Sequence, residues 1–494
     1  MRIAMVTEGT YPVSMGGVST WCDQLITGMP EHQFEVTAIV ATGRERDAWK
    51  APPNLAVVRR VPMWGAWPAP LRFRAADRRR AEHLLDAMWD AVLAPDSIVS
   101  HDRFAHTLRG LVEVSRTVSI ARMLAAKCSV PALLAAWQAQ QVPVGNRPLH
   151  VGEAVMVCGL VDRILALIDV RLSDVDVVHA TGNGPSALIG LAHMWRTRTP
   201  GVMSEHGVYL RERYLALGET EMPWAARRAI MAFISALCRL SYREYPKTLP
   251  VNRFNARWEK RLGAGQGQVE TIVNGVDPAM FTAVESEPEV PTISFVGRID
   301  PLKDLETLIR AFALVRQDVP DARLRIFGPV QPSNVPYKNE MVHLAAELGV
   351  SAALSWEGPS VGSRPAIEAG SIVALSSISE GLPFTLVEAM MCGRATVNTD
   401  VGGVSECLDD EQRTGRLVPA RDPRAFANAC TELLTNDLLR RRMGQLARQH
   451  GLKKFDLQVC LDGYRSQYAR AHACVEAEVP AVAVTVPPSL ERAG

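Results

Sequence analysis

The chain has 494 residues, with 54 Lys and Arg against 53 Asp and Glu, and is 47% apolar and 22% charged. This length exceeds one ordinary hydrophobic core, so two domains are expected, and the composition is that of a soluble globular protein. A net charge of +1 gives no support for a nucleic-acid-binding protein, which usually has a clear basic excess.

Strand-like apolar runs alternate with helical patterns in both halves of the chain, which predicts an α/β protein with two doubly wound parallel sheets. The first unit is expected within residues 1–284, with a mostly helical insertion at about 64–173. Its strands are predicted at 2–7, 34–40, 55–61, 175–180 and 200–204. The second unit is expected at 285–455, after an acidic, Pro-rich linker at 285–291. Its strands are predicted at 292–296, 324–327, 353–356, 372–375 and 395–398, with helices at about 305–315 and 338–348.

The spacing of the cysteines and the length of the apolar runs indicate the cellular compartment of the protein. The nine cysteines are widely spaced and form no C-x-x-C pair, which favours buried thiols in a reducing cytosol over disulfides or a zinc site. The apolar N-terminal stretch turns polar at Glu8, too early for a signal peptide, and no apolar run has the length of a membrane span. We therefore expect a cytoplasmic protein, at most peripheral at the inner face of a membrane.

The first unit carries a glycine pair and a polar cluster at predicted strand ends. Gly16 and Gly17 follow the first strand, where they would allow close backbone approach to a ligand or simply form a flexible turn. The chain has no complete G-x-G-x-x-G and no Walker lysine motif, which excludes a classical dinucleotide or P-loop site. His206 ends another strand and could reach a ligand in a cleft. Candidate acceptor contacts in the same cluster, or merely surface charges, are Glu205, Tyr209, Arg211 and Arg213.

Two other motifs of the first half favour plain structural roles. Asp174 and Asp176 resemble a metal-binding D-x-D, but they start a strand and would face away from the cleft. An arginine cluster that follows Trp64 could meet a membrane or a phosphorylated carrier lipid, although a solvated helix face is favoured. The cluster comprises Arg72, Arg74, Arg78, Arg79 and Arg80.

The second unit holds two cations after its first strand. Arg298 follows the strand directly, and Lys303 lies just before the next helix. A guanidinium and an ammonium at the carboxyl end of a strand suit a diphosphate. Lys303 could equally be a surface residue at a helix start.

The most informative segment contains Glu380 and Glu388, where a Gly/Pro loop is expected to enter a helix near Pro383. The free N–H groups of that helix would form a site for phosphate oxygens. They belong to Phe384, Thr385 and Leu386. Eight helical residues turn through about 800°, about 80° from full register, so both carboxylates could face one cleft. One would suit a sugar or ribose diol and the other a developing positive charge; alternatively, both are ordinary polar residues.

In order and spacing, these segments resemble the retaining GT-B glycosyltransferases of family GT4. The resemblance is carried by 15–17, 274–277, 295–298 with Lys303, 380–390 and 402–406. The cluster at 204–213 and the helical insertion are similar to the cytosolic glycosyltransferase of Pel-type exopolysaccharide systems. This chain has Gly381-Leu382-Pro383-Phe384 where many relatives place a second glycine, which leaves the backbone contacts to phosphate open.

The resemblance implies two Rossmann-like domains that face a cleft, with a nucleotide sugar, expected to be a UDP-sugar, held by the second. It also implies a helix at 456–475 that packs back on the first domain, leaving 476–494 as a tail expected to be disordered. Arg298 and Lys303 would neutralise the leaving diphosphate, and Glu388 would bind the ribose. Glu380 and His206 would contact the donor sugar. Gly16 and Gly17 would approach the phosphates or the acceptor.

The expected reaction is metal-independent transfer of the sugar, with retention and without a cofactor, to a glycan or lipid-linked acceptor in exopolysaccharide synthesis. Membrane polysaccharide-synthase subunits are candidate partners. Two alternatives stay open. A non-catalytic nucleotide-binding subunit should have eroded cation and carboxylate pairs, and a GT-B sugar-nucleotide epimerase should release an altered sugar without an acceptor.

Overall fold

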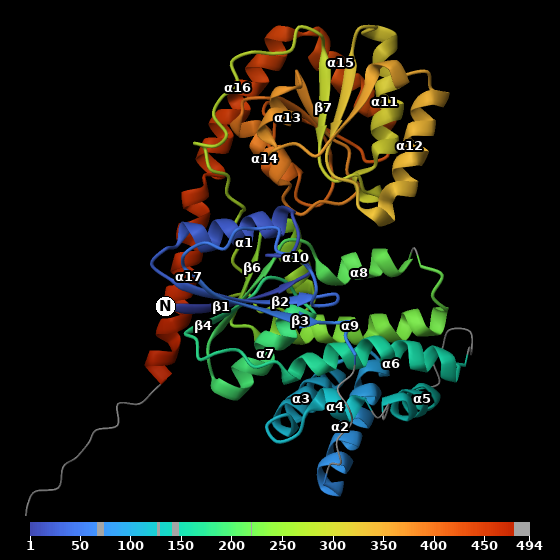
Figure 1. Ribbon diagram of the computed structural model, residues 1–494, viewed down its shortest axis with the longest axis vertical. Helices are drawn as coiled ribbons and strands as arrows, with labels where there is room; N and C mark the ends of the chain where they lie inside the picture. Colours follow the sequence, from blue (N-terminus) through green and yellow to red (C-terminus); the bar gives the residue numbers. More distant parts are fainter. Residues whose placement is uncertain (67–73, 126–128, 141–147, 219, 479–494) are drawn as a thin grey trace, which may run out of the picture.

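The computed structural model describes residues 1–66, 74–125, 129–140, 148–218 and 220–478. It contains two six-stranded parallel sheets, one in each half of the chain, and helices pack around both (Figure 1). The predicted α/β class with two parallel sheets is therefore confirmed. Among the described residues, no helix has the length and apolar character needed to cross a membrane.

The first sheet has the order β3-β2-β1-β4-β5-β6. Its strands are β1 (Arg2–Glu8), β2 (Gln33–Val40), β3 (Leu55–Pro62), β4 (Val177–Ala180), β5 (Gly201–Glu205) and β6 (Lys247–Pro250). The central strands are buried on both faces, as parallel strands covered by helices must be. All but β6 lie where the sequence predicts strands.

The second sheet has the order β12-β11-β10-β7-β8-β9. Its strands are β7 (Thr292–Val296), β8 (Arg323–Phe327), β9 (Leu354–Gly358), β10 (Ile372–Leu375), β11 (Ala395–Thr399) and β12 (Arg416–Val418). Only β12 lies outside the predicted strands. The strand order reverses between β1 and β4 and between β7 and β10, and ligands bind at such switch points in α/β sheets.

Most of the described residues between β3 and β4 are helical, as the sequence predicts. Its helices are α2 (Ala75–Leu93), α3 (Ile98–Val114), α4 (Ile120–Leu124), α5 (Ser129–Ala139) and α6 (Val151–Ala166). The remaining helices of the first half are α1 (Gly17–Gly28), α7 (Pro185–Thr197), α8 (Tyr209–Gly218), α9 (Trp224–Glu244) and α10 (Arg253–Arg261). Those of the second half are α11 (Leu305–Asp318), α12 (Val335–Glu347), α13 (Arg364–Glu368), α14 (Phe384–Met391), α15 (Pro423–Thr435), α16 (Asp437–Lys454) and α17 (Leu457–Glu478).

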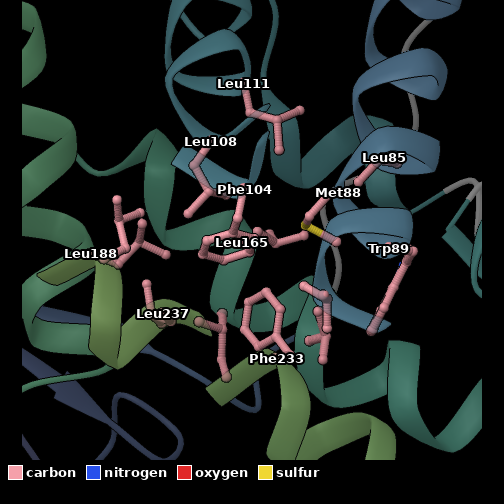
Figure 2. Packing of buried hydrophobic residues seen from close by; sticks show 14 of the residues in the cluster. Leu85, Met88, Trp89, Phe104, Leu108, Leu111, Leu165, Leu188, Phe233 and Leu237 are labelled. Atoms are coloured by element: carbon pink, nitrogen blue, oxygen red, sulfur yellow. The ribbon is translucent and has the colours of Figure 1, made fainter. Parts of the chain in front are cut away.

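The helical insertion shares one hydrophobic core with helices α7 and α9 of the first unit. Figure 2 shows Trp89 of α2 and Phe104 of α3 converging on Phe233 of α9. The ring centroids of Trp89 and Phe233 are 6.2 Å apart, and those of Phe104 and Phe233 6.1 Å. Since all three rings are buried, the insertion is a fixed part of the first unit and positions α9.

The two halves are joined where the chain crosses between them twice. Val276 N–H donates to the Phe455 carbonyl over 2.8 Å, and the two connections run side by side as a parallel bridge. Helix α17 then packs on the first sheet, where Tyr464 and Tyr468 are buried in the core around β1 and α1 (Figure 1). Residues 479–494 of the expected tail lie outside the described residues.

Several smaller expectations can be compared with the structure. The segment 285–291 has no helix or strand, but Glu287 pairs with the buried Arg440 over 2.6 Å and so ties this segment to the second unit. The seven cysteines whose side chains are described are buried and form no disulfides. Of the arginine cluster, Arg72 lies outside the described residues, whereas Arg74 and 78–80 are exposed at the start of α2. The membrane role of this cluster stays a prediction.

Candidate active site

The carboxyl ends of the two sheets meet at a close contact between loops. A Cβ atom on Gly381, after β10, would lie 1.8 Å from the carbonyl oxygen of His206, after β5. Nearby, a Cβ on Gly17 at the start of α1 would lie 3.3 Å from the ring of Phe384 at the start of α14. Gly16 caps α1 and faces open space. The structure thus brings Gly16, Gly17, His206 and Phe384 to one junction between the halves.

Glu380 and Lys303 form an ion pair at this junction. Lys303 Nζ donates to Glu380 Oε1, and Ser377 Oγ donates to the same oxygen over 2.6 Å. The side chains of Lys303 and Glu380 are 20% and 11% exposed, so the pair is largely shielded from water. The hydroxyl of Ser376 also bonds to the Lys303 carbonyl over 2.7 Å. The carboxylate is therefore held in a fixed place by its neighbours.

Arg298 provides an uncommitted positive charge next to this pair. It follows β7 and is exposed, and its guanidinium has no hydrogen-bond or ion-pair partner in the part of the chain that the structure describes. The backbone around it is fixed, because Gly297 N–H bonds to the Phe327 carbonyl and Ile299 N–H to the Pro329 carbonyl. An unpaired guanidinium on a rigid strand end is suited to binding phosphate.

Helix α14 begins at Phe384 with Pro383 as its N-cap, where the sequence predicts it. Its first N–H groups have no carbonyl one turn earlier to accept them, so they form an anion site with the positive end of the helix dipole. Thr385 Oγ1 donates to the Val296 carbonyl over 3.2 Å, and Leu386 is buried. These contacts fix the helix start beside the end of β7, which carries Arg298.

Glu388 lies in the second turn of α14, and its environment differs from that of Glu380. Burial raises the pKa of Glu388 to about 7, while a hydrogen bond with Ser363 acts in the opposite direction. Glu380 contacts Lys303 instead. The two carboxylates thus have separate partners, as two different roles would require.

His206 approaches the junction as a neutral imidazole. Burial lowers its pKa to about 3, and its ring packs edge-on against Trp21 with centroids 4.4 Å apart. Its Nε2 is buried and has no hydrogen-bond partner among the described residues. A neutral ring nitrogen without a partner keeps an unused capacity for one hydrogen bond.

Behind His206, a buried polar network ties β4 and β5 to α17. His179 bonds through Nδ1 to Tyr468 Oη over 2.7 Å and through Nε2 to Ser204 Oγ over 2.8 Å. Tyr464 bonds to the same Ser204 hydroxyl over 3.0 Å, and its ring contacts Trp21 with centroids 5.4 Å apart. The final helix therefore supports the wall on which His206 rests.

The expected acceptor cluster lies at the start of α8. Arg211 reaches across the junction and donates to Ser379 Oγ over 2.5 Å, directly before Glu380. The guanidinium of Arg213 lies 5.1 Å above the Tyr209 ring, and the Tyr209 hydroxyl is 3.5 Å from Glu8 Oε1. Arg211 is thus the member of this cluster that contacts the second half.

Glu8, which lies at the end of β1 and 3.5 Å from the Tyr209 hydroxyl, is a further candidate site residue that the sequence analysis does not name. Burial raises the pKa of Glu8 to about 7, and the charge of Arg213 acts in the opposite direction. The sequence contains a sign of this position, because Glu8 is a carboxylate at the carboxyl end of the first strand of the first sheet.

The structure does not bring Glu205 into the cleft. Its side chain is buried and accepts hydrogen bonds from Tyr209 N–H over 2.9 Å and Tyr242 Oη over 2.6 Å. It also faces Glu259, and burial raises the pKa of both carboxyls. A fully enclosed carboxyl pair supports the packing beneath α8 and does not reach an acceptor, so our expectation for Glu205 does not fit its position.

Asp174 and Asp176 have the structural role that the sequence favours. Asp176 accepts the Arg2 backbone N–H over 2.8 Å, and Asp174 pairs with the Arg2 guanidinium over 3.4 Å. Both lie at the amino end of β4, away from the junction. The described residues contain no group of three His, Cys, Asp or Glu side chains that could hold a metal ion.

The motif at 402–406 holds the two halves together. Glu406 accepts the backbone N–H groups of Arg253 and Phe254, each over 2.7 Å, and so caps α10 from the other half of the chain. A Cβ on Gly403 would lie 2.3 Å from Asn252 Nδ2 and 2.5 Å from the Gly381 carbonyl oxygen. Glycine is required here because the Asn252 side chain and the Gly381 backbone leave no room for a Cβ atom.

Two family models match the chain. The model described as Domain of unknown function (DUF3492) matches residues 1–267, and that of Glycosyl transferases group 1 matches residues 278–450. The D-inositol 3-phosphate glycosyltransferases of Salinispora arenicola and Mycolicibacterium gilvum are 31% and 33% identical over 43% and 35% of this chain. The aligned parts make up 52% and 41% of those proteins, so the chain spans about half the length of the curated relatives it matches.

Solved structures resemble the whole chain in fold. Sucrose-phosphate synthase from Thermosynechococcus elongatus has a TM-score of 0.63 at 16% identity, over 96% of this chain and 99% of that one. Anabaena HepE in complex with UDP-glucose has a TM-score of 0.58 at 13% identity, over 96% and 100%. The two parallel sheets are those of the GT-B fold. The chain therefore belongs to the DUF3492 family and joins that domain to a Glycosyl transferases group 1 domain.

Proposed function

We propose that this protein is a retaining, metal-independent glycosyltransferase that transfers a sugar from a UDP-sugar to a glycan or lipid-linked acceptor. One observation carries the proposal. The ion-paired Glu380, the unpartnered Arg298 and the free N–H groups of α14 lie together at the carboxyl ends of β7 and β10, opposite His206.

The charges of this site suit departure of a nucleoside diphosphate. Cleavage of the bond between the anomeric carbon and the diphosphate leaves negative charge on the phosphate oxygens. Arg298 and the N-terminus of α14 offer preorganised positive charge to them. Lys303 adds a further cation while it holds Glu380 in place. Positive charge develops on the sugar at the same time, and Glu380 would stabilise it.

Donor contacts follow from the surroundings of each group. Glu388 would bind the ribose hydroxyls of the nucleotide as a carboxylate, and the neutral His206 ring would bond to a hydroxyl of the sugar. In a front-face reaction, the acceptor oxygen bonds to the anomeric carbon on the side from which the diphosphate departs. Its proton passes to a phosphate oxygen, so no protein base is required. The complex of Anabaena HepE with UDP-glucose supports the choice of UDP-sugar.

We extend the proposal to exopolysaccharide synthesis of the Pel type, with the protein working on the cytoplasmic side together with membrane synthase subunits. Support comes from the helical insertion and the polar cluster at 204–213. A non-catalytic subunit agrees less well with the sequence, because such a protein would be expected to lose the cation pair or the carboxylate pair, and this chain has both. An epimerase would release an altered sugar from the donor without any acceptor.

Turnover of a panel of nucleotide sugars, followed by mass spectrometry, tests the proposal. We expect UDP release from one donor, with an α-linked product from an α-linked donor by NMR. Glu380→Ala should lower turnover by about 100-fold. Glu340→Ala, an exposed carboxylate on α12, is the matched control and should leave it unchanged. Absence of binding and turnover with every donor, with Glu380→Ala indistinguishable from wild type, would remove the basis of the proposal.

A further inference from the structure

A cavity lies next to the candidate active site, on the side of the helical insertion. It has a volume of about 570 Å³, is partly open to solvent and is lined by α8, α9, α10 and the end of α2. Ligand sites in proteins commonly have volumes of this order. Most of its wall is apolar, with Leu93, Leu210, Met231 and Trp258 among the lining residues.

Arg211 connects this cavity to the site of sugar transfer. It lines the cavity, and its guanidinium donates to Ser379 Oγ over 2.5 Å, directly before Glu380. A molecule in the cavity that extends past Arg211 therefore reaches the carboxylate proposed to face the donor sugar. In Figure 1, α8 lies between the two halves and above α9, and both helices supply lining residues of the cavity.

Helix α8 itself has the character of a ligand-binding wall. None of its described residues is buried, and the side chains of Tyr214 and Leu215 are 68% and 40% exposed. Contiguous exposed apolar surface commonly marks a site that binds a ligand or a partner. Tyr214 lines the cavity, so a molecule bound there would cover part of this surface.

The charge of the cavity selects an anion. Arg211 and Arg228 both line it, and no Asp or Glu is among its lining residues. The Arg228 guanidinium lies 5.7 Å from the ring centre of Trp224, and this contact leaves its N–H donors available for an anion. Two guanidinium groups at the edge of an apolar cavity match a phosphate attached to an apolar chain. A free oligosaccharide fits poorly, because Tyr214 and Ser235 are the main neutral hydroxyls available to it.

A second cavity lies beside the first, and its lining mixes apolar side chains with the charged Asp96, Arg239 and Arg243. It has a volume of about 310 Å³ and reaches α3. The two cavities share the lining residues Val92, Ala94, Ala232 and Ser235. The two cavities are therefore neighbours, but the charged lining of the second one suits the polar end of a ligand better than an apolar chain.

We propose that this cavity is the acceptor subsite and binds the apolar chain of a lipid phosphate, with the phosphate held by Arg211 and Arg228. The inference rests on the proposed glycosyl transfer and chooses the lipid-linked acceptor over a free glycan. It gives the helical insertion a function, since α2 supplies one wall of the subsite. The hydroxyl to be glycosylated would lie beyond the phosphate, on the side of Glu380.

Calorimetric titrations with octyl phosphate, octanol and inorganic phosphate test the subsite. Burial of two methylene groups already corresponds to about tenfold in affinity. Wild type should therefore bind octyl phosphate at least about tenfold more tightly than inorganic phosphate, and the two guanidinium groups should favour it over octanol by a similar factor. Met231→Trp fills the cavity and should weaken octyl phosphate binding about tenfold. Met280→Trp, at an exposed position outside the cavity, is the matched control and should bind like wild type.

Arg228→Gln decides the matter if Met231→Trp does not fold, because Arg228 is exposed and its replacement leaves the core intact. It should reduce the preference for octyl phosphate over octanol about threefold, because Arg211 remains. The inference is wrong if octyl phosphate binds no better than inorganic phosphate, or if Arg228→Gln retains the full preference. A parallel titration with UDP separates the two proposals. If wild type binds UDP but not octyl phosphate, only the subsite is refuted. If wild type does not bind UDP, the result counts against glycosyl transfer itself.

Discussion

A methyl group on Gly381 tests whether the two halves must touch as closely as they do. A Cβ atom there would lie 1.8 Å from the His206 carbonyl oxygen, and Cβ contacts essentially never fall below 3.0 Å. The two loops must therefore separate by at least about 1.2 Å. The backbone of Gly381 is not in the left-handed region, so alanine can adopt it and the effect comes from this contact.

The expected loss follows from that displacement. Glu380 directly precedes Gly381, and a misplacement of about 1 Å near reacting groups can cost about 100-fold in rate. We predict that Gly381→Ala lowers kcat/KM for transfer by about 100-fold. Crowding of this kind also costs about 1–3 kcal/mol of unfolding free energy.

UDP release assays and urea denaturation measure both effects. Gly159→Ala is the matched control, because a Cβ on Gly159 in α6 meets nothing within 4 Å. It should retain full activity and lose no stability. If kcat/KM of Gly381→Ala lies within about twofold of kcat/KM of this control, the close contact between the loops is not required for transfer, and the role assigned to it is wrong.

Three further changes probe the site and its support. The pKa of Glu388 is raised from 4.5 to about 7 by burial, so the folded state binds the proton more tightly than the unfolded state. Stability relative to Glu388→Gln should fall by up to about 3 kcal/mol as pH rises between these values, as measured by urea denaturation; a pH-independent difference would contradict the burial. Tyr468→Phe leaves His179 Nδ1 without its partner and should cost about 1–3 kcal/mol of unfolding free energy, whereas an unchanged midpoint would show that the bond contributes nothing. Lys303→Met leaves Glu380 unpaired and should lower stability by about 2 kcal/mol, with Glu380→Gln in the same chain restoring most of it; strictly additive effects in this double-mutant cycle would exclude the ion pair.

Most strands were predictable, because buried parallel strands give continuous apolar runs. The two that escaped prediction are both edge strands. β6 contains Lys-Thr-Leu-Pro and β12 Arg-Leu-Val. Proline is tolerated only at a sheet edge, and a strand of three residues is too short to show a pattern. Pairing with β5 and β11 creates these strands, and a local reading of the sequence does not contain that pairing.

In the candidate site, too, the local features were predictable from the sequence and the long-range contacts were not. The start of α14 and the place of Glu388 in its second turn follow from Pro383 and helical spacing. By contrast, the ion pair of Lys303 with Glu380 joins residues 77 apart in the chain, and Arg211 meets Ser379 at a separation of 168. Such contacts depend on how the two sheets face each other. The spacing of these residues in the sequence identifies them but does not predict how the two sheets face each other.

UDP release by Arg298→Gln tests the central claim most directly. Arg298 is exposed, has no partner among the described residues and lies at the carboxyl end of β7. Loss of its charge should lower kcat for UDP release from the donor by about 100- to 1,000-fold. Arg323→Gln makes the same change at the amino end of the same sheet, at the start of β8, and should leave the rate unchanged. Equal rates for the two variants would contradict the assignment of this site to sugar transfer.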